Sequence, residues 1–161
     1  MSDNNNSVSK ISCRGIWKVF GPHSDRIMAT LDENSARGEV QERTGHVIGV
    51  KNVSFDVQQG ETFVVMGLSG SGKSTLVRCM SRLVEPTAGQ VVIDGDDVVS
   101  MNERQLIELR RNKMSMVFQH FGLLPHRRVI DNIAYGLEVQ GISKTRRHET
   151  AGKVLEMVGL R

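Results

Sequence analysis

One glycine-rich loop constrains the fold and chemistry of this chain more than any other feature. The loop reads Gly67-Leu68-Ser69-Gly70-Ser71-Gly72-Lys73-Ser74-Thr75. It matches the pattern of a glycine, four residues and then Gly-Lys-Ser/Thr, which wraps a backbone around phosphate groups. Its glycines permit positive φ angles, and its N–H groups form a nest for an anion at the positive end of the following helix. The sequence therefore predicts a phosphate-binding site at this loop.

The polar side chains of the loop have separate expected roles. Lys73 places a positive charge between the β- and γ-phosphates, and the Ser74 hydroxyl suits a Mg²⁺ ligand. Thr75 is expected to donate to the α-phosphate. The alternative is a glycine-rich turn without a ligand, but chance produces the four fixed positions in well under ~1% of chains this long.

The segments that flank the loop predict an α/β fold. Thr62–Met66 is a continuous apolar run, typical of a parallel strand covered on both faces, and Met114–Phe118 is interpreted as a second buried strand. An amphipathic helix that ends at Glu85-Pro86 is predicted between them. Its apolar positions are Leu76, Val77, Met80, Leu83 and Val84.

Other strands are expected to form an antiparallel part. Ile11–Phe20 carries the apolar bulk of a strand, residues 52–57 alternate polar and apolar side chains, and Val91-Val92-Ile93 ends in an Asp94-Gly95 turn. Residues 21–46 are polar and are interpreted as an insertion with one short surface helix. Its apolar positions are Ile27, Met28 and Leu31.

Helices are predicted to dominate the last third of the chain. Ser100 and Glu103 fit a capping box that opens a helix to about Asn112. Two later segments have apolar residues at helical spacing, and Gly159 is placed to end the second one. The apolar positions are Ile130, Ile133, Ala134 and Leu137, then Ala151, Val154, Leu155 and Val158.

Composition narrows the class of protein. The net charge of +3 is mild, so nothing indicates a nucleic-acid partner. Cys13 and Cys79 lack metal-ligand spacing and are expected to be reduced thiols. The N-terminus lacks the order of a secretory signal. Apolar runs reach about five residues, far short of the ~20 that span a bilayer, so any membrane link is expected to come through a partner.

Four segments, in order, resemble the nucleotide-binding subunits of ABC transporters. They read GLSGSGKSTL, EPTAGQVVIDG, MVFQHFGLLPH and VIDNIAYGL, and the resemblance covers about residues 47–160. It implies a partial P-loop NTPase core of α/β class, with an N-terminal antiparallel β subdomain and the beginning of a helical subdomain. The implied layout is a disordered terminus (1–10), an ATP-binding core (11–118) that holds the insertion, and a Q-loop with a partial helical subdomain (119–161).

The resemblance also implies a function. KVFGPH, the insertion and TGHVIGVKNVSF look like the importer ATPases for glycine betaine, proline and other quaternary amines. Such a subunit binds ATP and Mg²⁺ and works as a homodimer on the cytoplasmic face of the inner membrane. It couples ATP hydrolysis to a permease, and indirectly to a substrate-binding protein.

Two residues outside the loop gain roles from the resemblance. Gln119 matches the Q-loop glutamine, which reaches Mg²⁺ and the attacking water and would act with Lys73 in catalysis. By itself it is a polar residue at the end of a strand. Phe20 resembles the aromatic residue that stacks on adenine. The alternative is a core aromatic, and Trp17 competes for the stacking role.

The segment Phe121–Tyr135 resembles the surface that receives the permease. Phe121, Leu123, Leu124 and Pro125 would then be exposed for a partner; the alternative is a loop packed on its own helices. Many relatives have a threonine where Arg128 stands here, so the cap of the next helix is expected to be weak. The charges at 127–128 and 144–147 are most simply solvated.

The sequence given contains no LSGGQ-type segment, no apolar strand ending in Asp-Glu and no switch histidine. This stretch by itself is therefore expected to bind nucleotide weakly and not to hydrolyse it, with an open sheet edge. Three alternatives stay open: a nucleotide-binding fragment without turnover, a soluble ABC ATPase without a permease, and, more distantly, a small-molecule kinase that shares only the loop.

Overall fold

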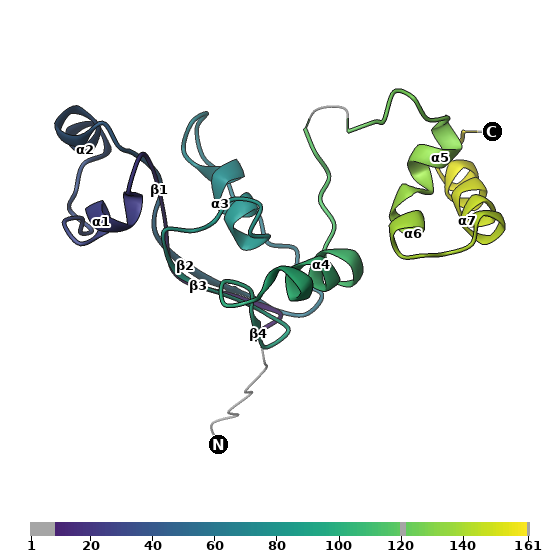
Figure 1. Ribbon diagram of the computed structural model, residues 1–161, viewed down its shortest axis with the longest axis horizontal. Helices are drawn as coiled ribbons and strands as arrows, with labels where there is room; N and C mark the ends of the chain where they lie inside the picture. The colour runs from purple at the N-terminus through teal and green to yellow at the C-terminus, as the bar shows by residue number, and fades with distance from the viewer. Residues whose placement is uncertain (1–8, 120–121, 161) are drawn as a thin grey trace, which may run out of the picture. The chain divides into compact units, whose positions relative to one another are not determined.

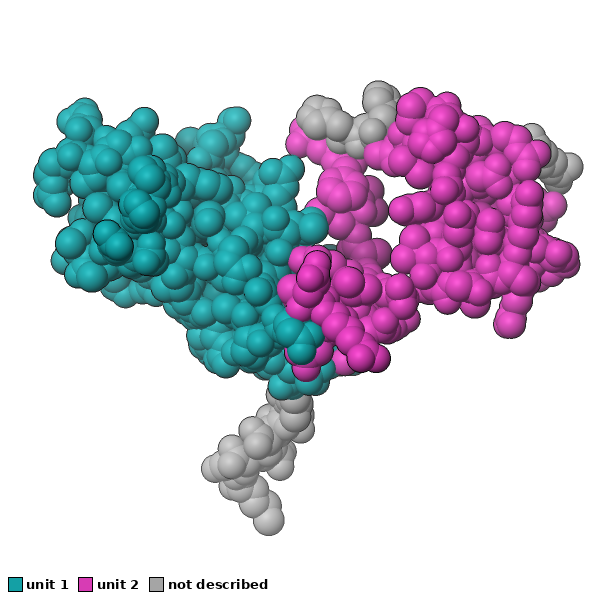
Figure 2. All heavy atoms as spheres, viewed as in Figure 1, with its two compact units in different colours: residues 1–102 teal, residues 103–161 magenta. Residues whose placement is uncertain are grey.

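The computed structural model describes residues 9–119 and 122–160. Two compact units divide the chain, Met1–Asn102 and Glu103–Arg161 (Figure 2). The division falls earlier than the boundary after residue 118 that the sequence suggested. The sequence predicted a disordered terminus at residues 1–10. Residues 1–8 of this segment lie outside the described residues.

A four-stranded sheet with the order β2-β1-β3-β4 organises the first unit (Figure 1). All of its pairings are antiparallel. The strands are β1 (Ile11–Phe20), β2 (Val47–Val57), β3 (Ala88–Ile93) and β4 (Asp96–Asp97). The predicted strand 11–20, the alternating strand and the Asp94-Gly95 turn are therefore confirmed. Both turn residues have positive φ, at 52° and 83°, which suits a two-residue hairpin loop.

The core of the first unit is built on this sheet, which packs against helix α3 (Lys73–Met80) and against the insertion. The largest fully buried side chains there are Ile16, Val19, Val91, Val98, Cys13 and Cys79. Burial raises the pKa of the Cys13 thiol to about 11, since a thiolate would lose its hydration. Both cysteines are free thiols, as the sequence predicted.

The insertion folds into two short helices rather than one. Helix α1 (Ser24–Met28) and helix α2 (Arg37–Thr44) follow β1. Val40 of α2 is buried with Trp17, Val19 and Ile48 of the sheet. The three predicted apolar positions, Ile27, Met28 and Leu31, pack against this cluster. The insertion is thus part of the hydrophobic core, although its composition is polar.

The two predicted parallel strands are wrong in this structure. Neither Thr62–Met66 nor Met114–Phe118 belongs to a strand. Met66 is 86% exposed and Val117 is 99% exposed. An apolar run becomes a strand only where a neighbouring strand pairs with its N–H and C=O groups, and among the described residues these segments pair with none. Phe63 instead stacks on Phe55 of β2, with ring centroids 4.7 Å apart.

Two helix ends also differ from the prediction. Helix α3 ends at Met80 instead of continuing to Glu85, because Arg82 has a φ of 52° that no α-helix accepts. The Arg82 guanidinium donates to the carbonyl oxygens of Val98 and Met101. The Ser100 hydroxyl donates to the Asp97 carbonyl. The next helix begins at Glu103, so Ser100 is not its N-cap residue and Glu103 is not its third residue, as the predicted capping box would require.

The second unit is helical. It comprises α4 (Glu103–Asn112), α5 (Val129–Ile133), α6 (Tyr135–Val139) and α7 (Lys144–Met157). The predicted helix around Ile130–Leu137 is present as two short helices joined at Ala134. Gly159 follows α7 with a φ of 76°, which confirms its role as a terminator. No helix in the described part of the chain is long and apolar enough to cross a membrane.

Candidate nucleotide-binding site

The phosphate loop, residues 67–75, leads from segment 62–66, which has no regular secondary structure, into helix α3. Gly70 and Gly72 have φ angles of 76° and 99°, which glycine adopts without strain. A Cβ at Gly72 would lie 2.1 Å from the carbonyl oxygen of Gly49 in β2. Glycine is therefore required at position 72 by both conformation and space. The loop rests directly on the backbone of the sheet.

Lys73 folds back over the loop that precedes it. Its Nζ donates to the carbonyl oxygens of Gly67 and Leu68, each at 2.7 Å, and lies 3.3 Å from the Ser71 hydroxyl. An arriving phosphate would compete with these oxygens for the ammonium group. No side chain caps α3 at Gly72, so the first N–H groups of the helix are left for an anion.

A pocket of about 290 Å³ brings the loop together with Phe20. Its lining residues are Phe20, Val47, Ile48, Gly49, Gly70, Ser71, Gly72, Lys73, Ser74 and Thr75. Phe20 ends β1 and is 42% exposed, whereas Trp17 is 8% exposed and belongs to the core cluster. Geometry therefore favours Phe20 over Trp17 as the residue available to a base, and adenine stacking stays a prediction. Gly67, Leu68 and Ser69 complete the loop outside this lining.

Gln119 lies in the second unit and is exposed. Its predicted roles in catalysis and Mg²⁺ binding stay predictions. Of the expected permease-facing residues, Phe121 lies outside the described residues, while Leu123 is 66% exposed. The segment around Leu124 is held to α5, because the Asn132 side chain accepts from the Leu124 N–H and donates to its carbonyl.

Two residues that support the loop were not predicted from the sequence. Gly49 lies beneath Gly72, and a Cβ there would lie 2.6 Å from the Phe20 ring and 3.3 Å from Thr75. A glycine inside a strand often marks such a close approach, so this signal was available. Arg37 of α2 donates to the carbonyl oxygen of Ser71 at 3.4 Å. No pattern in the sequence pointed to that contact.

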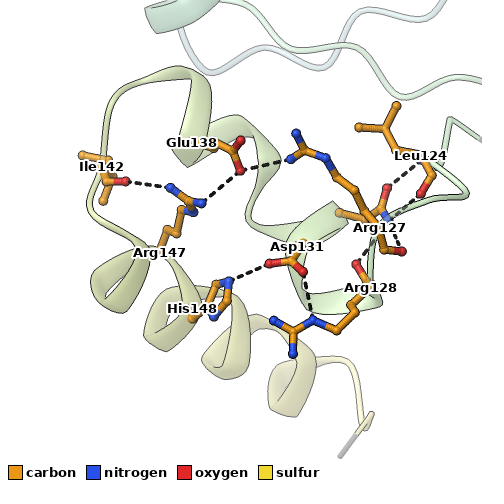
Figure 3. Close-up of polar contacts among 9 residues, drawn as sticks. Leu124, Arg127, Arg128, Asp131, Glu138, Ile142, Arg147 and His148 are labelled. Atoms are coloured by element: carbon orange, nitrogen blue, oxygen red, sulfur yellow. Dashed lines mark hydrogen bonds and ion pairs between the residues drawn. The ribbon is translucent and has the colours of Figure 1, made fainter.

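Charged residues of the second unit form a network instead of a solvated face (Figure 3). Glu138 of α6 accepts from Arg127 at 3.0 Å and from Arg147 of α7 at 3.1 Å. Asp131 of α5 pairs with Arg128 and with His148. The sequence interpretation of residues 127–128 and 144–147 as solvated is wrong for Arg127 and Arg147, whose side chains are 27% and 18% exposed, because folding of the helices brings Glu138 within reach. Arg128 stays largely solvated, with its side chain 72% exposed.

The predicted weakness at the start of α5 is confirmed. Arg128 is the N-cap residue, and its side chain makes no capping hydrogen bond. Its guanidinium instead pairs with Asp131 in the first turn. This hydrogen bond, followed by the one to His148, holds the pKa of the Asp131 carboxyl below its usual range.

Comparisons with known proteins agree with the geometry of the loop. The ABC transporter family matches residues 50–161. The glycine betaine/carnitine transport ATP-binding protein of Listeria monocytogenes is 46% identical over 95% of this chain and 38% of its own length. The glycine betaine/proline betaine transport system ATP-binding protein of Escherichia coli is 46% identical over 94% of this chain and 38% of its own length.

A relative with a different named substrate has a slightly higher identity to this chain. The trimethylamine N-oxide transport system ATP-binding protein of Ruegeria pomeroyi is 51% identical over 93% of this chain and 44% of its own length. The chain therefore spans less than half the length of these curated relatives.

A solved structure supports the fold. A dimeric ATP-binding cassette in a post-hydrolysis state, bound to ADP and phosphate, matches with a TM-score of 0.73 and 27% identity. The match covers 94% of this chain and 58% of that chain. It confirms the predicted partial P-loop NTPase core of α/β class. Because the family match takes in most of the chain and the whole phosphate loop, this chain belongs to the ABC transporter family.

Proposed function

We propose that this chain is the ATP-binding, energy-coupling part of an ABC importer for glycine betaine, proline or related quaternary amines. The observation that carries the proposal is the pocket in which the phosphate loop and the exposed ring of Phe20 meet. Two similar relatives are named as glycine betaine transport ATP-binding proteins, which supports the substrate class. The similar cassette that holds ADP and phosphate supports the ligand.

In this proposal the loop binds nucleotide mainly through its backbone and one cation. N–H groups of residues 67–72 and of the first turn of α3 donate to the phosphate oxygens. Lys73 leaves the carbonyl oxygens of Gly67 and Leu68 and pairs with the β- and γ-phosphates. Thr75 donates to the α-phosphate, and the Phe20 ring stacks on the base.

The residues present also fit Mg²⁺. This ion prefers oxygen ligands and keeps several waters while it binds substrate phosphates. The Ser74 hydroxyl is exposed in the first turn of α3 and lines the pocket, which suits one such ligand. The bound ion would neutralise phosphate charge. Gln119 would supply a second oxygen and position the attacking water.

The proposed setting is the cytoplasmic face of the inner membrane, as a peripheral subunit. A second copy of the complete subunit would complete each ATP site. Transmembrane permease subunits would receive the movement, and a substrate-binding protein would act through them. The names of the relatives as parts of transport systems support this arrangement, and so does the dimeric form of the solved cassette.

The first test is nucleotide binding by the full-length protein. Lys73→Ala should raise the dissociation constant for MgATP by about a hundredfold, since charge-assisted phosphate contacts are lost. Isothermal titration measures the change, with Lys153→Ala on the exposed side of α7 as a matched control. Equal affinity of the Lys73 variant and the control would contradict the proposal.

A second arm tests transport. The full-length protein, reconstituted with its permease in proteoliposomes, should hydrolyse ATP faster when glycine betaine and the binding protein are added. A soluble ABC ATPase would hydrolyse ATP without responding to the permease. A binding protein without turnover would release no phosphate under either condition.

A further inference from the structure

The insertion at residues 21–46 is anchored to the sheet at several points. Its base is closed by His46, whose Nε2 lies 2.8 Å from the Pro22 carbonyl oxygen and whose Nδ1 lies 2.9 Å from the Thr44 carbonyl oxygen. Val40 is buried in the sheet cluster. Just ahead of α2, the Lys51 ammonium of β2 donates to the Ser35 carbonyl at 2.8 Å. The start of α2 is therefore fixed relative to β2.

This anchoring places Arg37, the first residue of α2, against the phosphate loop. Its Nη2 donates to the carbonyl oxygen of Ser71 at 3.4 Å. Arg37, Lys51 and Lys73 also line a second pocket of about 250 Å³ beside the loop, and no acidic residue is among its lining residues. The insertion thus adds positive charge next to the loop.

The hydrogen bond from Arg37 to the Ser71 carbonyl also affects the N–H of the same peptide group, which belongs to Gly72. The described peptide bonds are trans, so the carbonyl of Ser71 and the N–H of Gly72 point in opposite directions across one plane. A guanidinium 3.4 Å from the carbonyl oxygen therefore favours the peptide orientation in which the Gly72 N–H points away from Arg37. Arg37 lines the second pocket but not the nucleotide pocket, and Gly72 lines both. The cation also withdraws electrons from the peptide and makes this N–H a stronger donor.

We propose that Arg37 is a positioning residue of the phosphate site: it orients and polarises the Ser71–Gly72 peptide so that the Gly72 N–H is held ready for a phosphate oxygen. The inference rests on the proposed nucleotide binding and deepens it. The insertion then becomes part of the site and couples its own fold to nucleotide affinity. Gly72 is suited to this role because the Gly49 carbonyl blocks any side chain there.

Titrations of the full-length protein with MgATP, MgADP and AMP test the proposal. Arg37→Met removes the charge and keeps a long apolar stem, and it should weaken MgATP and MgADP by about tenfold, the usual effect of losing a hydrogen bond to a charged group. The backbone of a phosphate-binding loop of this kind holds the β- and γ-phosphates, so the affinity for AMP, which has neither, should change by less than about twofold. Arg37→Lys should recover part of the loss. Arg43→Ala, exposed on the last turn of the same helix, is the control.

A spectroscopic readout separates positioning from general support of the fold. In the nucleotide-free protein, the Gly72 amide resonance should shift in Arg37→Met, while that of Gly70 should stay in place. An unshifted Gly72 resonance, or MgATP affinity within about twofold of the parent, would overturn the inference. So would an equal loss for AMP or for the Arg43 control. A parent protein that binds no ATP would overturn the proposed function and this inference with it; a parent that binds ATP alongside an unaffected Arg37→Met overturns the inference alone.

Discussion

The two compact units of this chain differ in the interactions that stabilise each of them internally. The first unit buries many apolar side chains of the antiparallel sheet and α3, and the insertion packs its own apolar side chains on Trp17, Val19 and Ile48 of the sheet. In the second unit, the buried apolar side chains among the described residues are Leu106, Leu109, Ala134 and Ala151. Its helices α5, α6 and α7 are tied by the ion pairs of Glu138 and by the hydrogen bond between His148 and Asp131.

This difference suits two different tasks. Phosphate binding needs backbone donors that are already in place before the ligand arrives, and the first unit supplies them by pressing Gly72 onto the Gly49 backbone. Partly exposed ion pairs contribute little free energy and weaken with salt. A unit held in that way opens at lower cost, and such regions are the ones from which moving elements are drawn.

The largest effect on the first unit is expected from a substitution at Gly72. Gly72→Ala should lower the free energy of unfolding by about 3 kcal/mol or more and abolish ATP binding, because the new methyl group would overlap the Gly49 carbonyl. Gly70→Ala is the matched control: its φ is also positive, but no atom lies within 4 Å of the added Cβ. It should cost only about 1 kcal/mol. Urea denaturation and ATP titration measure both, and similar losses would show that the close contact is unimportant.

The next test concerns Glu138 in the second unit. Glu138→Gln removes the charge that pairs with Arg127 and Arg147, and it should destabilise the helices of this unit by about 1 kcal/mol. The effect should shrink at high salt, since screening already weakens the pairs in the parent protein. Amide hydrogen exchange of α6 and α7 reports this locally. Glu149→Gln, exposed on α7, is the control; a salt-independent effect would argue against ion pairing.

The smallest expected effect is the response of the Asp131 pair to acid. Arg128 and His148 lower the pKa of Asp131 in the folded state, so its contribution to stability is present above the unfolded value of about 3.9. That contribution is lost as the pH falls through the lower folded pKa. Asp131→Asn should therefore flatten the loss of α5–α7 protection below about pH 4. An unchanged acid profile in this variant would show that the pair contributes nothing.

Much of the fold follows from local pattern, and the failures are informative. Period-two alternation identified β2, and turn residues identified the β3–β4 hairpin. The buried strands at 62–66 and 114–118 were predicted wrongly. An apolar run indicates that a segment tends to be buried, but it does not show that the segment pairs with another strand. Whether it forms a strand depends on a partner elsewhere in the chain. The contribution of the insertion to the core was not predicted, because most of its residues are polar. Four apolar side chains are nevertheless enough to pack it on the sheet.

The phosphate loop, the pattern of its glycines and the resemblance to ABC transporter subunits can all be read from the sequence. These features are written in contiguous residues, since a loop of nine residues carries its own backbone requirements. Three contacts exist only in the folded chain: Phe20 rather than Trp17 lines the pocket, Gly49 lies beneath Gly72, and Arg37 donates to Ser71. Those contacts join residues far apart in the chain, and their geometry is set by strand register and helix packing, which no short stretch of sequence contains.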